Sequence, residues 1–182
     1  MRLSQPHDLA RLLRESLEHQ PARKNPASDS KPGAAARPGV FIAYVMEDAE
    51  LATRLYAQLE EIGFDPWMDK HKLLPGENWL RAIERAIETS RFFVACLSSR
   101  SVDKRSRFQA ELRYALDCAT LMPAGDIFFI PVRFDQCRVP WTIARSIQYV
   151  DLFPDWDRGI KRVLKMACEQ LLRDLPPDDE GE

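Results

Sequence analysis

The chain has 182 residues and a formal net charge of −2. That length suffices for one domain with a sizeable core, and the mild acidity argues against a basic nucleic-acid footprint. No apolar run reaches the roughly 20 residues that span a membrane, and the N-terminus lacks the apolar core of a signal peptide. We therefore expect a cytoplasmic protein that binds neither nucleic acid nor membrane.

Residues 1–20 form a leader in which residues 8–19 can make a short amphipathic helix, marginal by itself. Residues 21–38 are rich in proline and small polar residues, which is typical of a linker. We expect the folded domain over residues 39–174 and an acidic tail over residues 175–182.

The first strand is predicted over residues 40–45, which are mostly apolar and β-prone. Asp48 can cap the next helix, which Gly63 ends. The apolar face of that helix consists of Leu51, Leu55, Leu59 and Ile62.

Residues 64–68 read as a short second strand, and Pro66 places it near a sheet edge. A loop over residues 69–78 follows, with a turn at its Pro-Gly pair. Asn78 caps a third helix. Its inward side is expected to consist of Trp79, Ile83, Ala86 and Ile87.

Residues 92–97 form a continuous apolar run, as expected of a strand covered on both faces. Ser106 is a good N-cap for the helix that follows, in which apolar residues recur at helical spacing as Phe108, Leu112, Ala115 and Ala119.

Glu111 projects roughly 60° from the centre of that stripe, so its carboxylate should lie at the margin of the core. A buried charge without a partner is costly. Glu111 is therefore either a structural residue, paired with Arg107, Lys104 or a backbone donor, or a functional one.

Two further strands are predicted over residues 127–132 and 147–152, separated by residues 133–145, which show no clear period. A helix over about residues 155–172 closes the domain, with Ile160, Val163, Leu164, Ala167 and Leu171 on its apolar side.

The alternation of strands and helices predicts an α/β fold: a flavodoxin-like, doubly wound, parallel five-stranded sheet with helices on both faces. Ligands bind such sheets beyond the carboxyl ends of the strands. By this rule we expect residues 44–47, 69–78 and 98–105 to surround one ligand site at the carboxyl ends of the strands.

Several chemistries are absent from the sequence. The four cysteines form no C-x-x-C pair and have no histidine at ligand spacing, so we expect reduced thiols and no metal. No G-x-S-x-G elbow is present, so Ser98 and Ser99 read as loop or capping residues. A dinucleotide-binding Rossmann domain would need glycines after the first strand, where VMEDAE has none. A phospho-receiver would need an aspartate after the third strand, which ends Leu97-Ser98.

Four blocks carry a resemblance to a known family: VFIAYVMED, FDPWMDKHKLLPGENW, AIERAIETSRFFVACLS and AELRYAL. In order and separation they resemble the Toll/interleukin-1 receptor (TIR) domain, especially its bacterial members, over about residues 40–172. The resemblance implies the TIR version of the doubly wound fold.

Many members of that family cleave NAD⁺ to nicotinamide and ADP-ribose or a cyclic form. Their catalytic glutamate lies on the helix after the third strand in a pattern similar to W-x-x-x-E-[LIV], which Glu111 matches. By the same resemblance Ala43 and Tyr44 should line the nicotinamide side of the cleft, with Asp69 and Lys72 as further contacts. NAD⁺ would be the substrate, and no cofactor is implied.

The loop at residues 69–78 resembles the family's BB loop, which mediates self-association or binding to other TIR domains. Its expected docking residues are Leu73, Leu74, Pro75 and Gly76.

Two residues depart from the family pattern. Arg107 stands where the family usually has tryptophan, and its guanidinium would either contact the substrate ring or clamp Glu111 in a salt bridge. Ala43 replaces a common serine. The alternative function is therefore a catalytically silent TIR adaptor.

Overall fold

Five parallel strands form one sheet in the order β2-β1-β3-β4-β5. The computed structural model describes residues 37–68, 78–102 and 107–174. The strands are β1 (Gly39–Ala43), β2 (Asp65–Trp67), β3 (Phe92–Leu97), β4 (Phe129–Arg133) and β5 (Val150–Asp151). Because the chain adds β2 on one side of β1 and β3 on the other, the strand order reverses between β1 and β3.

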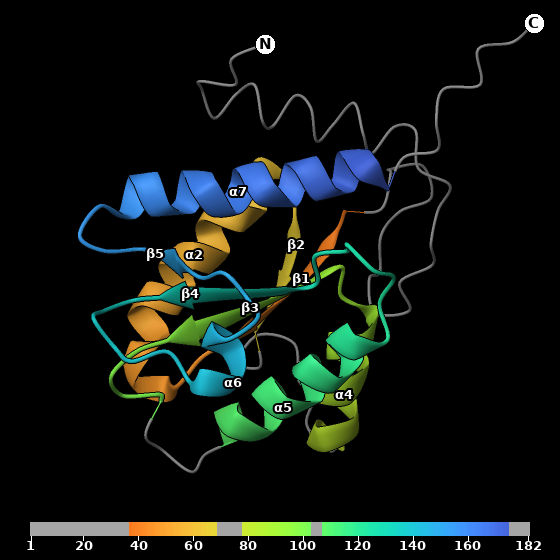
Figure 1. Cartoon of the computed structure of the whole chain (residues 1–182), viewed down its shortest axis with the longest axis horizontal. Coiled ribbons are helices and arrows are strands. Elements are labelled where there is room, and N and C mark those ends of the chain that lie inside the picture. The colour runs from red at the N-terminus through yellow and green to blue at the C-terminus, as the bar shows by residue number, and fades with distance from the viewer. Residues whose placement is uncertain (1–36, 69–77, 103–106, 175–182) are drawn as a thin grey trace, which may run out of the picture.

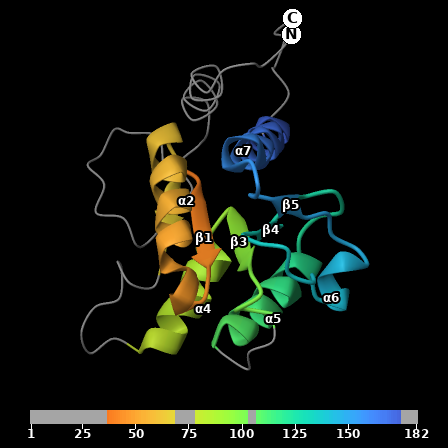
Figure 2. The same cartoon turned by 90° about the vertical axis from the view of Figure 1, so that its left-hand side faces the viewer.

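The helices cover both faces of this sheet (Figures 1 and 2). One layer holds the helices α2 and α7, and the other holds α4, α5 and α6. Their bounds are η1 (Met46–Asp48, a short 3-10 helix), α2 (Ala49–Ile62), α4 (Trp79–Thr89), α5 (Arg107–Thr120), α6 (Trp141–Ala144) and α7 (Trp156–Arg173). The prediction of a doubly wound, parallel five-stranded sheet is confirmed.

Each face of the sheet has its own apolar core. On the α2–α7 side Val40, Ile42 and Val94 pack against the inward faces of these two helices. On the other side four aromatic rings stack across four neighbouring strands. Ring centroids lie 4.7 Å apart for Phe41 and Trp67, 5.2 Å for Phe41 and Phe93, and 5.3 Å for Phe93 and Phe129. All six residues of β3 are buried, as its unbroken apolar run predicts.

Two helix boundaries follow the predicted start and stop signals at Asn78 and Gly63. The Asn78 side chain accepts a hydrogen bond from the Arg81 amide at 3.3 Å at the start of α4. Gly63 ends α2 in the left-handed conformation, with φ of 113°, which glycine adopts without steric cost. The five apolar residues predicted to face inward from α7 are all buried.

Several element boundaries differ from the prediction, and β4, for example, spans Phe129–Arg133 where residues 127–132 are expected. β1 ends at Ala43 because the chain turns into η1, where the Asp48 amide bonds the Val45 carbonyl at 2.8 Å. β5 is confined to Val150–Asp151, the stretch in register with the last two residues of β4. The aperiodic stretch 133–145 contains α6, a single turn with one buried residue, Ile143, which is too short to show a helical period.

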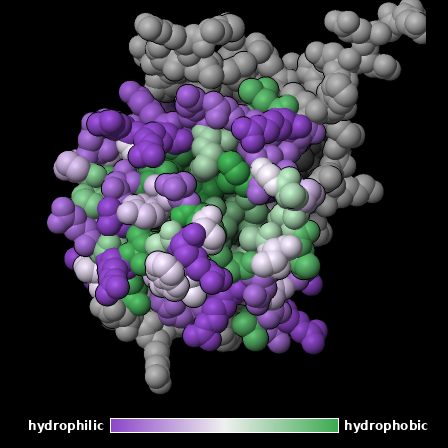
Figure 3. Space-filling view, viewed as in Figure 1, coloured by the Kyte–Doolittle hydropathy of each residue, from purple (hydrophilic) through white to green (hydrophobic). Residues whose placement is uncertain are grey.

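The face seen in Figure 1 is largely hydrophilic, and apolar side chains gather in its middle, over β4 between α7 and α5 (Figure 3). Among the described residues no helix is long and apolar enough to cross a bilayer. The expectations for the leader, most of the linker and the acidic tail fall on residues 1–36 and 175–182, outside the described residues.

Candidate functional site

The carboxyl ends of β1 and β3 lie side by side where the strand order reverses. Open α/β sheets bind their ligands at such a point. Residues 44–48 leave β1 here, and residues 98–102 leave β3. The helix α5 is the next element after β3 in the chain, and it begins near this edge of the sheet (Figure 1).

Glu111 lies in the second turn of α5 and is only 8% exposed. Its neighbours on the helix, Phe108, Leu112 and Ala115, are all buried in the core below the sheet. The expectation that this carboxylate lies at the margin of the core is therefore confirmed. The two expected ion-pair partners, the side chain of Arg107 and all of Lys104, lie outside the described part of the chain.

Ala43 and Tyr44 lie on different sides of the sheet. Ala43, 1% exposed, belongs to the same core cluster as the α5 residues that flank Glu111. Tyr44 packs instead against the cluster covered by α2 and α7. The structure thus brings Ala43 and Glu111 to one face, while a substrate contact by Tyr44 stays a prediction.

The remaining predicted site residues lie outside the described residues. They are Asp69, Lys72, the self-association residues Leu73, Leu74, Pro75 and Gly76, and the side chains of Arg107 and Trp79.

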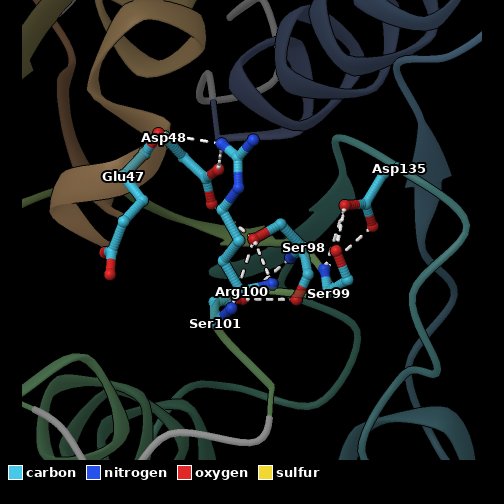
Figure 4. Close-up of polar contacts among 7 residues, drawn as sticks. All are labelled: Glu47, Asp48, Ser98, Ser99, Arg100, Ser101 and Asp135. Atoms are coloured by element: carbon cyan, nitrogen blue, oxygen red, sulfur yellow. Dashed lines mark hydrogen bonds and ion pairs between the residues drawn. The ribbon is translucent and has the colours of Figure 1, made fainter.

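Asp48 differs from its predicted role. It occupies the N-cap position of α2, but its side chain makes no capping hydrogen bond. The carboxylate is 3% exposed and accepts hydrogen bonds from the Ser98 hydroxyl and, at 3.1 Å, from Arg100 Nη1 (Figure 4). The buried carboxylate thus binds a hydroxyl and a guanidinium in place of a helix amide, and the positive charge of the guanidinium offsets its own.

A second carboxylate holds the same loop from the opposite side. Asp135, which follows β4, accepts hydrogen bonds from the Ser99 amide at 2.9 Å and from the Ser99 hydroxyl at 2.7 Å (Figure 4). Ser98 and Ser99 are therefore loop residues, as predicted. The loop after β3 is fixed between Asp48 on the β1 side and Asp135 on the β4 side.

The sequence carried one signal for this arrangement. Three serines fall within residues 98–101, and acidic residues follow the first and fourth strands. Asp48 and Asp135 lie 50 and 36 residues from the serines that they bind. Only the strand order β1-β3-β4 brings them together.

All four cysteines are free, and no group of potential metal ligands occurs within residues 37–68, 78–102 and 107–174. Burial raises the pKa of the Cys96 thiol well above its usual value, with a further contribution from the Asp48 charge.

The family follows from comparison with known proteins. A sequence model of the TIR domain matches residues 40–164, more than half of the chain. The chain therefore belongs to the TIR domain family, as its motifs suggested. A comparison with curated proteins finds no significant match.

Solved structures share the fold. The TIR domain of the Toll-related receptor TRR-2 from Hydra magnipapillata matches with a TM-score of 0.55 and 23% identity, over 69% of this chain and 97% of that one. A TIR-STING receptor from C. gigas, in complex with 2′,3′-cGAMP, matches with a TM-score of 0.55 and 19% identity, over 76% of this chain and 39% of that one.

The TIR domains of the activated Roq1 resistosome, which directly recognises the effector XopQ, match with a TM-score of 0.53 and 18% identity. That match covers 76% of this chain and 99% of the other. At these identities the similarity concerns the fold.

Proposed function

We propose that the protein is an NAD⁺ glycohydrolase that cleaves the bond between nicotinamide and ribose, with Glu111 as its catalytic carboxylate. The observation that carries the proposal is the position of Glu111. It is a nearly buried carboxylate on the helix that starts beside the carboxyl ends of β1 and β3. The residue also falls on the glutamate pattern that the TIR resemblance supplies.

The chemistry suits a single carboxylate. Nicotinamide leaves as a neutral molecule from a ring that is already cationic, so the departing group needs no strong acid. Positive charge develops on the ribose as an oxocarbenium ion, and a carboxylate that holds the ribose hydroxyls stabilises it. The low exposure of Glu111 adds to the effect, because a charge interacts more strongly where water is excluded.

We further propose that the site is completed by self-association, or by contact with other TIR domains, through the loop at residues 69–78. This stretch of the sequence follows β2, the strand at one edge of the sheet. In this account NAD⁺ is a substrate, and the activity serves cytoplasmic signalling or bacterial defence.

The second candidate is a silent TIR adaptor that binds other TIR domains without cleaving NAD⁺. Two features favour it. Ala43 lies buried at the end of β1 and offers no hydroxyl to the cleft, and Arg107 replaces the family's tryptophan four residues before Glu111.

Incubation of the purified chain with NAD⁺ separates the two functions. We expect free nicotinamide, together with ADP-ribose or its cyclic form, when the reaction is followed by chromatography at high protein concentration or with a crowding agent. A chain that assembles under these conditions and releases no nicotinamide is an adaptor.

A further inference from the structure

One hydrogen bond joins the loop after β3 directly to the helix that carries Glu111. The Gln109 side-chain amide donates from Nε2 to the Ser101 carbonyl at 3.1 Å. Gln109 precedes Glu111 by two residues in α5, so this bond is made in the turn before the one that carries the carboxylate.

The loop itself is closed by a pair of serines. The Ser98 amide donates to the Ser101 hydroxyl at 2.7 Å, and that hydroxyl donates to the Ser98 carbonyl at 3.1 Å. The Ser101 amide in turn donates to the Ser98 hydroxyl at 3.2 Å. Both side chains are buried, at 1% and 0% exposure, so water does not compete for these bonds.

Asp48 holds this closed loop against the neighbouring strand. Its carboxylate accepts a hydrogen bond from the Ser98 hydroxyl, and Arg100, whose side chain is largely exposed, pairs with the carboxylate charge (Figure 4). Arg100 Nη1 also donates to the Glu47 carbonyl at 2.9 Å, which ties the segment after β1 to the segment after β3. A continuous hydrogen-bonded path therefore runs from Asp48 through Ser98, Ser101 and Gln109 to α5.

We propose that Asp48 is a positioning residue for Glu111 and acts through this path. The inference rests on the proposed catalytic role of Glu111. The core side of α5 packs through apolar residues such as Phe108, Leu112 and Ala115, and Tyr114 donates a hydrogen bond to Glu88 of α4. Apolar contacts have no preferred direction, so they allow a helix to shift or rotate slightly. Directional hydrogen bonds to Asp48 would hold Glu111 at the place where the ribose reacts. A small displacement of a catalytic group lowers the reaction rate strongly.

Two variants test the path at its two ends. Gln109→Ala removes the bond to α5 from a partly exposed position and leaves the core intact. Asp48→Asn keeps the shape of the side chain and one acceptor oxygen but removes the charge, which weakens its bonds to Ser98 and Arg100. Arg113→Ala is the matched control, an exposed position on the same helix with no described bond to the loop.

We expect both variants to lower kcat for NAD⁺ roughly 10- to 100-fold with KM within about twofold of wild type, because the substrate still binds while the carboxylate is misplaced. Arg113→Ala should retain the wild-type kcat. The kcat of the double variant Asp48→Asn/Gln109→Ala should be no lower than that of the slower single variant, since both substitutions weaken the same series of hydrogen bonds.

Hydrogen exchange provides a readout that is independent of activity. Peptides covering residues 107–113 should exchange faster in both variants, whereas peptides of α7 should not change. Wild-type kcat in Gln109→Ala, or unchanged exchange in α5, would overturn the inference.

Glu111→Gln in the same series keeps the two proposals distinguishable. An inactive Glu111→Gln beside fully active Gln109→Ala and Asp48→Asn refutes only the positioning path. A wild type without turnover refutes the proposed function, and the exchange of α5 then decides the path alone.

Discussion

The four cysteines differ in how far each thiol reaches solvent. Burial raises the pKa of Cys137 to about 11 and that of Cys168 to about 12, and it raises the pKa of Cys96 well above its usual value. Cys118 is half-buried on α5, where it packs against the edge of the core, and its pKa is raised mainly by partial burial and the nearby Glu88. The thiolate is the reactive form of cysteine, so both accessibility and pKa favour reaction at Cys118.

We therefore expect an aromatic disulfide reagent at pH 8 to modify Cys118 first in the native protein. The other three thiols should react only as fast as the fold opens, and all four should react quickly in denaturant. Peptide mapping after brief labelling identifies the modified residue. Equal labelling of Cys96 and Cys118 in folded protein would contradict the burial seen here.

At the scale of single residues, local patterns and long-range contacts were not equally predictable. The position of Glu111 at the core margin followed from helical periodicity, because the stripe that defines the core lies within the same helix. The role of Asp48 did not, because its partner Ser98 lies 50 residues away. From sequence alone, an aspartate at the start of a helix is predicted to cap it, and only the strand order shows that Asp48 lies next to Ser98.

The same distinction holds for elements. The apolar stripe of α7 was predictable because its 18 residues span several helical turns. The single turn of α6 and the two residues of β5 were not, since each is shorter than the period that would reveal it.

The contact between α7 and β5 requires a glycine that periodicity did not single out. A Cβ at Gly159 would lie 2.4 Å from the Asp151 carbonyl oxygen and 2.9 Å from Leu152 Cα, both backbone atoms that cannot move aside freely. The absence of a side chain lets the first turn of α7 lie directly on the end of β5.

Gly159→Ala should therefore destabilise the protein by about 1–3 kcal/mol, as overpacking in a core does. The melting temperature should fall by roughly 2–4 °C per kcal/mol. Lys161→Ala, at an exposed position in the same helix, is the control and should leave the melting temperature nearly unchanged. A Gly159→Ala variant as stable as this control would show that β5 and α7 separate easily.

On the scale of the whole molecule, the proposed activity should depend on assembly. The loop at residues 69–78 holds two leucines beside a Pro-Gly turn, a composition suited to docking on a neighbour. A cleft completed across such a contact would exclude water from the ribose and strengthen the effect of the carboxylate.

Specific activity should therefore rise with protein concentration. Pro75→Ala and Gly76→Ala should suppress that rise while leaving the melting temperature close to wild type. Sedimentation at the same concentrations reports whether the oligomer forms. Specific activity that stays constant over a hundredfold dilution, with fully active loop variants, would show that the monomer is sufficient.

Glu111→Gln tests the central claim most directly, because it keeps the size and hydrogen-bonding ability of the side chain and removes only its charge. We expect kcat for nicotinamide release from NAD⁺ to fall at least about a hundredfold, with a melting temperature within about 3 °C of wild type. A folded Glu111→Gln protein that turns over NAD⁺ at the wild-type rate would contradict the assignment of Glu111 as the catalytic carboxylate.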